Sequence, residues 1–185
     1  MKLSEIKEEE LIVMLHKEDM QHNAFSLLVK EYSEQLYWQI RKIVLSHDDA
    51  NDVLQNTFIK VWNNIGSFRG ESKLLTWLYK IATNESITFL NKQRTQNNIP
   101  LDDEENFMYS KLESDPYFDG DEAQKKLQKA ILTLPEKQRI VFNMKYFDDM
   151  KYEEMSDILE TSVGALKASY HHAVKKIEEF LISSN

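Results

Sequence analysis

The sequence predicts an all-α protein with two helical domains joined by an acidic linker. Helix-breaking residues are rare, since the 185 residues include only 4 glycines and 3 prolines. Apolar residues recur at steps of three and four, the period of an amphipathic helix, and no segment alternates as a strand does. The net charge of −8 is concentrated in residues 101–122, which hold nine acidic residues and one basic residue.

The first predicted domain spans residues 8–94, where the apolar residues repeat with a helical period. Its clearest stripes start at Phe25, Leu54 and Leu74, and their spacing predicts four helices in this block. Ser46, with an acidic residue three positions later, fits a capping box at the start of the helix that contains Leu54. We therefore expect a compact four-helix domain.

Residues 95–122 are expected to form the linker between the domains. The segment is polar, contains Pro100, Pro116 and Gly120, and shows no apolar repeat of helical period. Repulsion among its acidic residues favours an extended chain. We interpret the segment as a solvated tether that sets the reach between the domains, and its charge also fits an imitation of nucleic acid.

The second predicted domain spans residues 123–182 and also contains four helices. Thr133–Glu136 fits a capping box, with Pro135 in the first turn of the helix that follows. Tyr152–Leu159 has the pattern of a short helix, and a tight connection follows in which Thr161 or Ser162 can cap a longer helix. Two helices joined in this way are typical of a helix-turn-helix unit.

The longer helix has one apolar face and one face of small and polar residues. The apolar stripe consists of Val163, Leu166, Tyr170, Val174 and Ile177. Small residues on the opposite face would let the helix backbone approach the major groove of DNA closely. The same pattern fits a plain pair of packed helices, so the pattern alone leaves both interpretations open.

The composition disfavours several classes of function. Cysteine is absent, no apolar run reaches the roughly 18 residues of a membrane helix, and the acidic start lacks the apolar core of a signal peptide. We therefore expect a cytoplasmic protein without direct membrane insertion. No nucleophile paired with a base, phosphate-binding glycine loop or metal-ligand cluster is evident, so we expect no enzyme activity, cofactor, metal site or small-molecule substrate.

Two short patterns could suggest metal chemistry. Asp48, Asp49 and Asp52 spell the DDxxD motif that collects magnesium in isoprenoid synthases, but the block is too short for that fold and no second acidic motif is present. We interpret these residues as the acidic start of a helix. His171 and His172 are adjacent and therefore point in different directions on a helix, which disfavours a shared metal ion.

The second domain carries LTLPEKQRIVF at 132–142, YFDDMKYEEM at 146–155 and TSVGALK at 161–167. Together these segments resemble region 4 of the extracytoplasmic-function (ECF) sigma factors of bacterial RNA polymerase. The resemblance implies that the longer helix lies in the major groove of the upstream, or −35, promoter element. The residues that it places at this DNA are Ser162, Gly164, Ala165, Lys167, Ala168, His171 and Lys175. Fewer arginines follow Lys167 than the family usually has, so we expect this domain alone to bind DNA weakly.

The first domain resembles region 2 of the same family in two segments. One is DDANDVLQNTFIKVW at 48–62, which is similar to the helix that docks on the coiled coil of the largest polymerase subunit. The resemblance implies that Asp52, Gln55 and Asn56 face the polymerase, with Asn56 standing where the family commonly has glutamate. A polar, hydrogen-bonding patch suits a separable interface of this kind.

The other segment, GSFRGESKLLTWLYKIATN at 66–84, resembles the promoter-melting part of region 2. The resemblance implies that Phe68 stacks on an extruded base of the −10 element while Ser72 and Asn84 read the edge of that base. The cations that it places at the phosphates are Arg69, Lys73, Lys80, Lys92 and Arg94.

As a whole, the resemblance implies a sigma factor that binds core RNA polymerase, recognises the −35 and −10 elements of promoter DNA and assists DNA melting. It also implies an anti-sigma factor as a further partner. Two alternatives from other classes stay open. One is a stand-alone helix-turn-helix transcription regulator that binds duplex DNA tightly without polymerase. The other is a sigma-derived protein-binding adaptor that binds polymerase without directing transcription.

Overall fold

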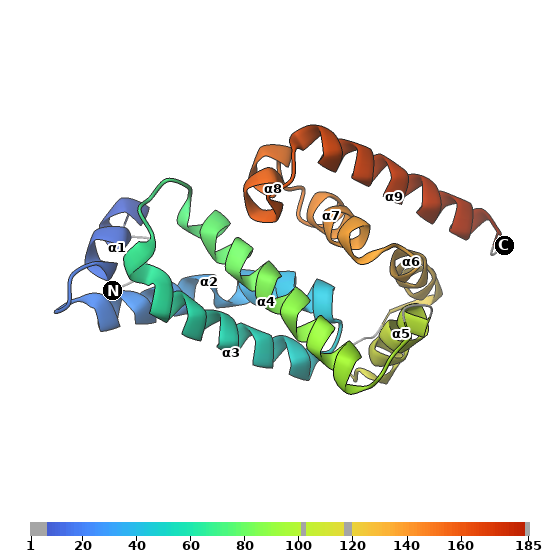
Figure 1. Ribbon diagram of the computed structural model, residues 1–185, viewed down its shortest axis with the longest axis horizontal. Helices are drawn as coiled ribbons and strands as arrows, with labels where there is room; N and C mark the ends of the chain where they lie inside the picture. The colour runs from blue at the N-terminus through green and yellow to red at the C-terminus, as the bar shows by residue number, and fades with distance from the viewer. Residues whose placement is uncertain (1–6, 101–102, 117–119, 184–185) are drawn as a thin grey trace.

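The protein is helical throughout the part of the chain that the structure describes. The computed structural model describes residues 7–100, 103–116 and 120–183, and no strand occurs among them (Figure 1). The α-helices are α1 (Glu8–Leu15), α2 (Gln21–Val44), α3 (His47–Asn64), α4 (Leu74–Gln96), α5 (Glu104–Ser114), α6 (Glu122–Leu132), α7 (Glu136–Tyr146), α8 (Tyr152–Leu159) and α9 (Val163–Ser183), and a short 3-10 helix, η2 (Ile65–Ser67), follows α3. The all-α prediction is confirmed.

Helices α1 to α4 form the first helical unit, as the apolar stripes predict. Helices α2, α3 and α4 pack against one another, and α1 lies against α2 (Figure 1). Their core includes the fully buried Leu28, Leu36 and Leu78. The predicted cap at Ser46 is confirmed, since its hydroxyl accepts a hydrogen bond from the backbone N–H of Asp49 at 3.4 Å.

The start of α4 is held by a side chain from α1. The backbone N–H of Leu74 donates to the carboxylate of Glu8 at 3.0 Å. A carboxylate at this position satisfies an N–H that has no partner within the helix, and it interacts favourably with the helix dipole. Helix α1 therefore fixes the end of α4 that follows the loop at 68–73.

Helices α6 to α9 form the second helical unit, again with four helices as predicted. A small apolar core joins Ala130, Ile131, Leu134, Phe142, Ala173 and Ile177. The predicted capping box at Thr133 is wrong, because the Thr133 hydroxyl donates to the carbonyl of Ala130 at 2.7 Å and Pro135 takes the N-cap position of α7. A capping box forms instead at the start of α6, between Asp121 and Gln124.

The prediction that residues 95–122 stay extended is wrong for their central part, which forms α5. Met108 and Leu112 lie one turn apart and are buried, at 0% and 3% exposure. Lys111 offsets part of the acidic charge, since its ammonium lies 2.5 Å from the Asp49 carboxylate of α3. Apolar burial and this ion pair together outweigh the repulsion that favoured an extended chain. The domain boundaries themselves stay a prediction.

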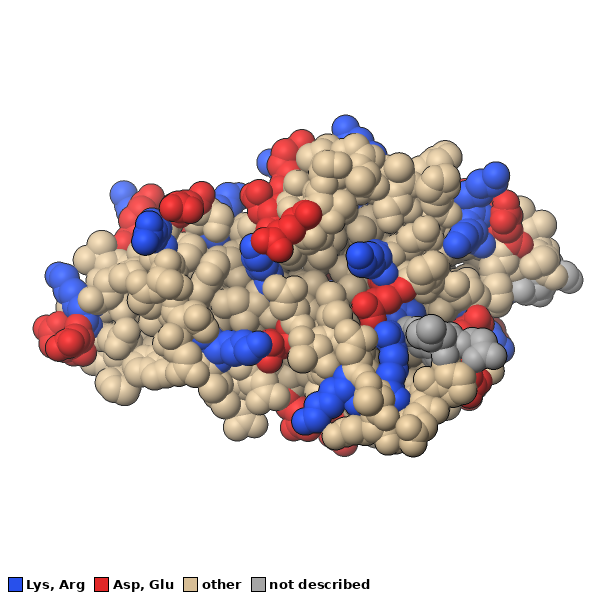
Figure 2. Space-filling view, in the orientation of Figure 1, with Lys and Arg blue, Asp and Glu red and all other residues tan. Residues whose placement is uncertain are grey.

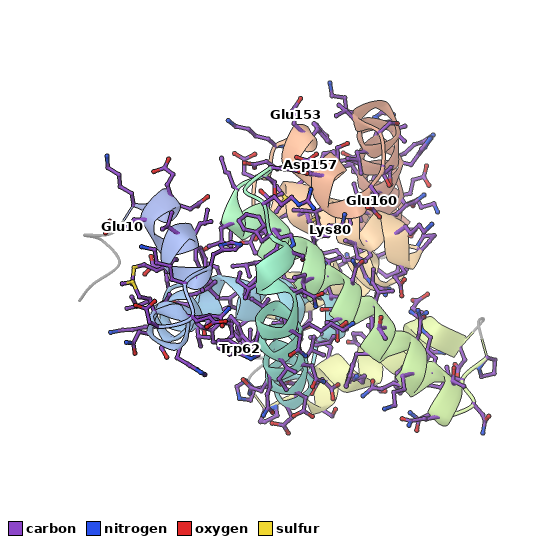
Figure 3. All side chains as sticks on the ribbon, turned by 60° about the vertical axis from the view of Figure 1, so that its left-hand side comes forward. Glu10, Trp62, Lys80, Glu153, Asp157 and Glu160 are labelled. Carbon is purple, nitrogen blue, oxygen red and sulfur yellow. The ribbon has the colours of Figure 1, made fainter. Side chains whose placement is uncertain are left out.

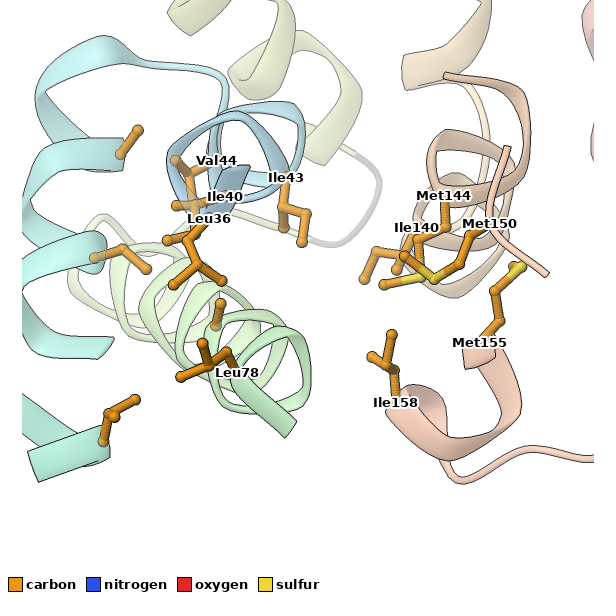
Figure 4. Close-up of a cluster of buried hydrophobic side chains, with 14 of the residues drawn as sticks. Leu36, Ile40, Ile43, Val44, Leu78, Ile140, Met144, Met150, Met155 and Ile158 are labelled. Atoms are coloured by element: carbon orange, nitrogen blue, oxygen red, sulfur yellow. The ribbon is translucent and has the colours of Figure 1, made fainter. Parts of the chain in front are cut away.

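The two helical units are in contact. Helix α8 packs on α4, and α7 reaches α2. Apolar side chains of α7, α8 and the loop between them join the same buried cluster as Leu36 and Leu78, namely Ile140, Met144, Met150, Met155 and Ile158 (Figure 4). The side-chain amide of Asn143 also donates to the Lys42 carbonyl at 3.2 Å. The second unit is therefore not held by the linker alone.

None of the helices in the described part of the chain has both the length and the apolar character needed to span a bilayer.

The docking of α5 can be tested by truncating its most buried side chain. We expect Met108→Ala to lower the free energy of unfolding by about 2–4 kcal/mol, because the substitution leaves a cavity. Urea denaturation measures the change. Glu105→Ala, an exposed substitution on the same helix, should stay within about 0.5 kcal/mol. An equally small effect of Met108→Ala would contradict the packing of this helix.

Candidate polymerase and promoter interface

Three polar side chains of α3 lie exposed on one face of the helix. Asp52, Gln55 and Asn56 are spaced by three and one residues, while Val53 and Thr57 between and after them are buried. Helical spacing thus separates the polar face from the core. The structure places these three residues together on one exposed face, and their contact with polymerase stays a prediction.

The same three side chains border a concavity shared with α4. Its volume is about 410 Å³, and its lining from α4 includes Phe89, Lys92 and Gln93. Lys92, predicted to hold a phosphate, therefore lies beside the predicted polymerase patch. Asp49 also lines this concavity, but its carboxylate is paired with Lys111 of α5 and accepts a hydrogen bond from Gln93 at 3.3 Å.

The loop between η2 and α4 forms a second concavity, of about 320 Å³. Its lining consists of Ser67, Phe68, Arg69, Glu71, Ser72 and Trp77. Gly70 has φ of 72°, a left-handed conformation that glycine adopts without steric cost. The turn at Gly70 therefore lets exposed Arg69 and half-buried Ser72 border one hollow.

The sequence predicts a Phe68 ring that is available to stack on a base, but the structure buries this ring. The Phe68 side chain is only 4% exposed, and its ring centroid lies 5.0 Å from that of Trp77. The polar neighbours in the sequence hide this contact, because Trp77 comes from the following helix. In this conformation the ring is thus a wall of the concavity rather than a free stacking platform, and its predicted contact with a base stays a prediction.

The predicted promoter-contacting residues of α4 and of its N-cap position, Lys73, fall into two groups. Lys73, Lys80 and Asn84 recur at steps of seven and four, which places them along one face, and Asn84 is exposed. Arg94 lies near the other end of the helix and is largely covered, because its guanidinium pairs with Glu136 of α7 at 2.7 Å. The structure does not bring Arg94 to the concavity at Phe68.

Lys73 and Lys80 are paired with carboxylates of the second unit. The Lys73 ammonium lies 3.1 Å from Glu154 of α8, and the Lys80 ammonium lies 2.7 Å from Glu160. The hydrogen bond from Lys80 and the positive charge of Lys80 lower the pKa of Glu160 below its usual value. Figure 2 shows acidic side chains gathered where α8 lies, next to basic side chains.

The second unit contains the predicted helix-turn-helix, formed by α8 and α9. Glu160 adopts a left-handed conformation, with φ of 51°, at the sharp connection between them. The hydroxyl of Ser162 accepts a hydrogen bond from the Ala165 N–H at 3.3 Å, so Ser162 is the one of the two predicted caps that forms. Leu166 and Ala173 face inward. The predicted DNA-facing residues all lie exposed: Ser162, Gly164, Ala165, Lys167, Ala168, His171 and Lys175.

Asp115 is a positioning residue that the sequence interpretation missed. Its carboxylate, 2% exposed, accepts hydrogen bonds from Arg41 at 2.8 Å and from the backbone N–H of His47 at 2.6 Å. It therefore ties the end of the linker helix to the start of α3, the helix that carries Asp52. No signal in the sequence distinguishes Asp115 from the other acidic residues around it.

Comparisons with known proteins agree with this geometry. Residues 28–96 match the family model described as Sigma-70 region 2, and residues 124–177 match Sigma-70, region 4. The ECF RNA polymerase sigma factor SigW of Bacillus subtilis is 30% identical over 167 residues, which cover 86% of this chain and 89% of SigW. The chain belongs to the ECF family of RNA polymerase sigma factors.

Other relatives of this sigma factor are similar over most of their length. The ECF RNA polymerase sigma-E factor of Haemophilus influenzae is 31% identical, covering 84% of this chain and 86% of that protein. Among solved structures, CnrH in complex with the cytosolic domain of CnrY has a TM-score of 0.69 at 18% identity, covering 96% and 99% of the two chains. Sigma factor RpoE with anti-sigma factor NepR from Bartonella quintana has a TM-score of 0.65 at 21% identity, covering 87% and 98%. These two likenesses support the fold.

The acidic start of α3 in this sigma factor does not form a metal cluster. Among the residues that the structure describes, no group of three or more His, Cys, Asp or Glu side chains is arranged to hold a metal ion. Asp49, the middle residue of the DDxxD pattern, is engaged by Lys111. ECF sigma factors are not known as enzymes.

The role of Asp115 can be tested by removing its charge. We expect Asp115→Asn to lower the free energy of unfolding by about 1–3 kcal/mol, because it leaves Arg41 and the His47 N–H with a weaker acceptor. Thermal or urea unfolding of the whole protein measures this change. Asp19→Asn makes the same chemical change at an exposed site and serves as the control. Equal stability of the two variants would show that the Asp115 contact contributes nothing.

Proposed function

We propose that this sigma factor binds core RNA polymerase through the exposed face of α3 and directs it to promoters with both helical units. Helix α9 would read the −35 element as duplex DNA. The loop at 66–73 and the exposed face of α4 would capture unpaired bases of the −10 element. Most site residues predicted from the sequence are thereby assigned to three surfaces, while Lys92 borders the α3 surface and Arg94 is covered by Glu136.

The concavity at Phe68 and Trp77 carries this proposal. It combines aromatic walls with polar groups such as Ser72 and a nearby cation, Arg69. Proteins hold unstacked bases with this combination, since the aromatic ring contacts the face of the base and polar groups bind its edge. Asn84, exposed on α4, is proposed to contact the same strand.

Promoter opening then follows from binding alone. A protein that binds the unpaired strand better than the duplex shifts the equilibrium toward the melted state by the difference in binding free energy. No covalent step by this chain is needed. The cytoplasmic location, where core polymerase acts, stays a prediction.

We also infer that an anti-sigma factor binds this chain. One structural neighbour, RpoE, is in complex with the anti-sigma factor NepR. The other, CnrH, is in complex with the cytosolic domain of CnrY. A groove of about 530 Å³ runs between α2 and α7 of this chain, and the exposed aromatic side chains of Trp38 and Phe147 line it. An apolar groove that spans both helical units would suit a partner that binds both at once.

Polymerase capture tests the α3 surface. We expect Asp52→Ala to weaken binding to purified core polymerase by about tenfold, because it removes a charged group from a polar interface. Asn63→Ala, on an exposed position of the same helix, should bind as the wild type does. Fluorescence anisotropy of the labelled protein gives both affinities. Unchanged binding by Asp52→Ala would remove α3 from the interface.

Strand opening tests the α4 surface. We expect Asn84→Ala to reduce run-off transcription from duplex promoters several-fold, while transcription from a template with a pre-melted −10 region is less affected. Purified core polymerase, the variant and a genomic promoter library provide the assay. An equal loss on both templates would show that Asn84 does not contribute to strand opening.

The two alternatives predict different results in the same assay. A stand-alone regulator would bind promoter duplex tightly without polymerase, whereas the small number of cations on α9 predicts weak binding at physiological salt. A protein-binding adaptor would bind core polymerase but support no run-off product. Transcription that depends on both core polymerase and this chain excludes both alternatives.

A further inference from the structure

Lys92, predicted to hold a promoter phosphate, points in a different direction from Lys80 on the same helix. Lys80 lies on the side of α4 that faces the second unit, where Figure 3 shows it beside Glu160. At about 100° per residue, the positions from Lys80 to Lys92 turn the two side chains about 120° apart around the helix axis. Helix α4 therefore presents these two lysines to different surroundings.

Lys92 lies on the side of α4 that faces α3. Glu85, two helical turns earlier and so on the same side of α4, forms an ion pair with Lys60 of α3. Lys92 itself lines the concavity of about 410 Å³ between α3 and α4, together with Asp52. Within the part of the chain that the structure describes, neither Lys92 nor Asp52 has an ion-pair partner. Both charges are therefore available to a molecule that enters the concavity.

The concavity is too small for polymerase and DNA to share. Its volume corresponds to a hollow about 9 Å across, whereas one α-helix with its side chains is about 10 Å wide. Asp52, Gln55 and Asn56 of α3 line it, and Lys92 lines it from α4. A polymerase segment that contacts the three α3 residues therefore lies against Lys92 and leaves no room there for a DNA strand.

We propose that Lys92 binds core polymerase instead of promoter phosphates. The concavity receives a polymerase segment in which a carboxylate pairs with Lys92 and a basic side chain pairs with Asp52. The polymerase-binding surface thus extends from α3 onto α4. The inference rests on the proposed function, because it takes from that function the contact between the exposed face of α3 and polymerase.

The side chains that line the concavity support a protein partner of this chemistry. Asp49 also lines it but is engaged by Lys111 of α5, so Asp52 is the carboxylate left for a partner. A DNA strand carries negative charge alone and is repelled by Asp52, whereas a protein surface can match charges of both signs. The half-buried ring of Phe89 adds apolar surface to this polar hollow, a combination that is typical of protein interfaces.

Affinity for core polymerase is the first readout of the test. We expect Lys92→Ala to weaken binding of the whole protein to purified core polymerase about three- to tenfold, because one charged contact is lost. Lys92→Glu should weaken binding further, because its carboxylate would repel the polymerase carboxylate. Lys30→Ala makes the same change in charge at an exposed position of α2 and should bind as the wild type does. Fluorescence anisotropy of the labelled proteins gives these affinities.

The salt dependence of promoter binding is the second readout. Each phosphate contact contributes about 0.7 to 0.9 to the slope of the logarithm of the binding constant against the logarithm of salt concentration. The slope is measured with core polymerase that each variant saturates. We expect Lys92→Ala to keep the wild-type slope. Arg69→Ala, which removes a cation from the loop proposed to hold DNA, should reduce the slope by about one such contact.

Any one of three results would overturn the proposal. These are wild-type affinity of Lys92→Ala for core polymerase, an equal loss of affinity in Lys30→Ala, and a reduced salt slope in Lys92→Ala. Asp52→Ala is measured in parallel. If Asp52→Ala weakens polymerase binding and Lys92→Ala does not, the role of Lys92 is rejected and the proposed function stands. If neither variant weakens binding, the proposed α3 surface is rejected as well.

Discussion

The packing of α4 between the two helical units is the contact on which the rest of the structure depends. One side of α4 places Leu78, Ala82 and Leu90 in the core with α2 and α3. Its other side carries the cations and Asn84, and part of that side is covered by α8. Since Glu8 of α1 holds the first residue of the helix, α4 has little freedom to rotate. Formation of the core therefore fixes the orientation of the exposed face of α4.

The linker contributes to this arrangement instead of only connecting two domains. Helix α5 is docked by Met108 and Leu112, and Asp115 ties its end to α2 and α3. An 11-residue helix spans about 20 Å less than the same residues extended. Release of α5 would thus lengthen the reach between the units. Closing of the domains and folding of the linker are expected to be coupled, because both shorten the molecule.

Local patterns in the sequence predict the helices well and the contacts between distant segments poorly. Eight helices and the caps at Ser46 and Ser162 follow from nearby residues. Helix α5 is missed because its few apolar residues, Phe107–Tyr109 and Leu112, are too short a run to show a helical repeat, and tertiary burial stabilises the helix. The exposure of Phe68 depends on Trp77, and the pairing of Glu160 with Lys80 joins residues 80 positions apart. The sequence around a charged residue does not indicate an ion-pair partner that lies far away in the chain.

The most direct test of the account is the distance between the two units when the protein joins its polymerase. Energy transfer between dyes on α3 and α9 is measured in the free protein, with core polymerase, and with core polymerase and promoter DNA. The account predicts high transfer in the free protein and a large loss on addition of core polymerase. Unchanged transfer in a complex that actively transcribes would contradict it, because α4 would then act on promoter DNA while still covered by α8.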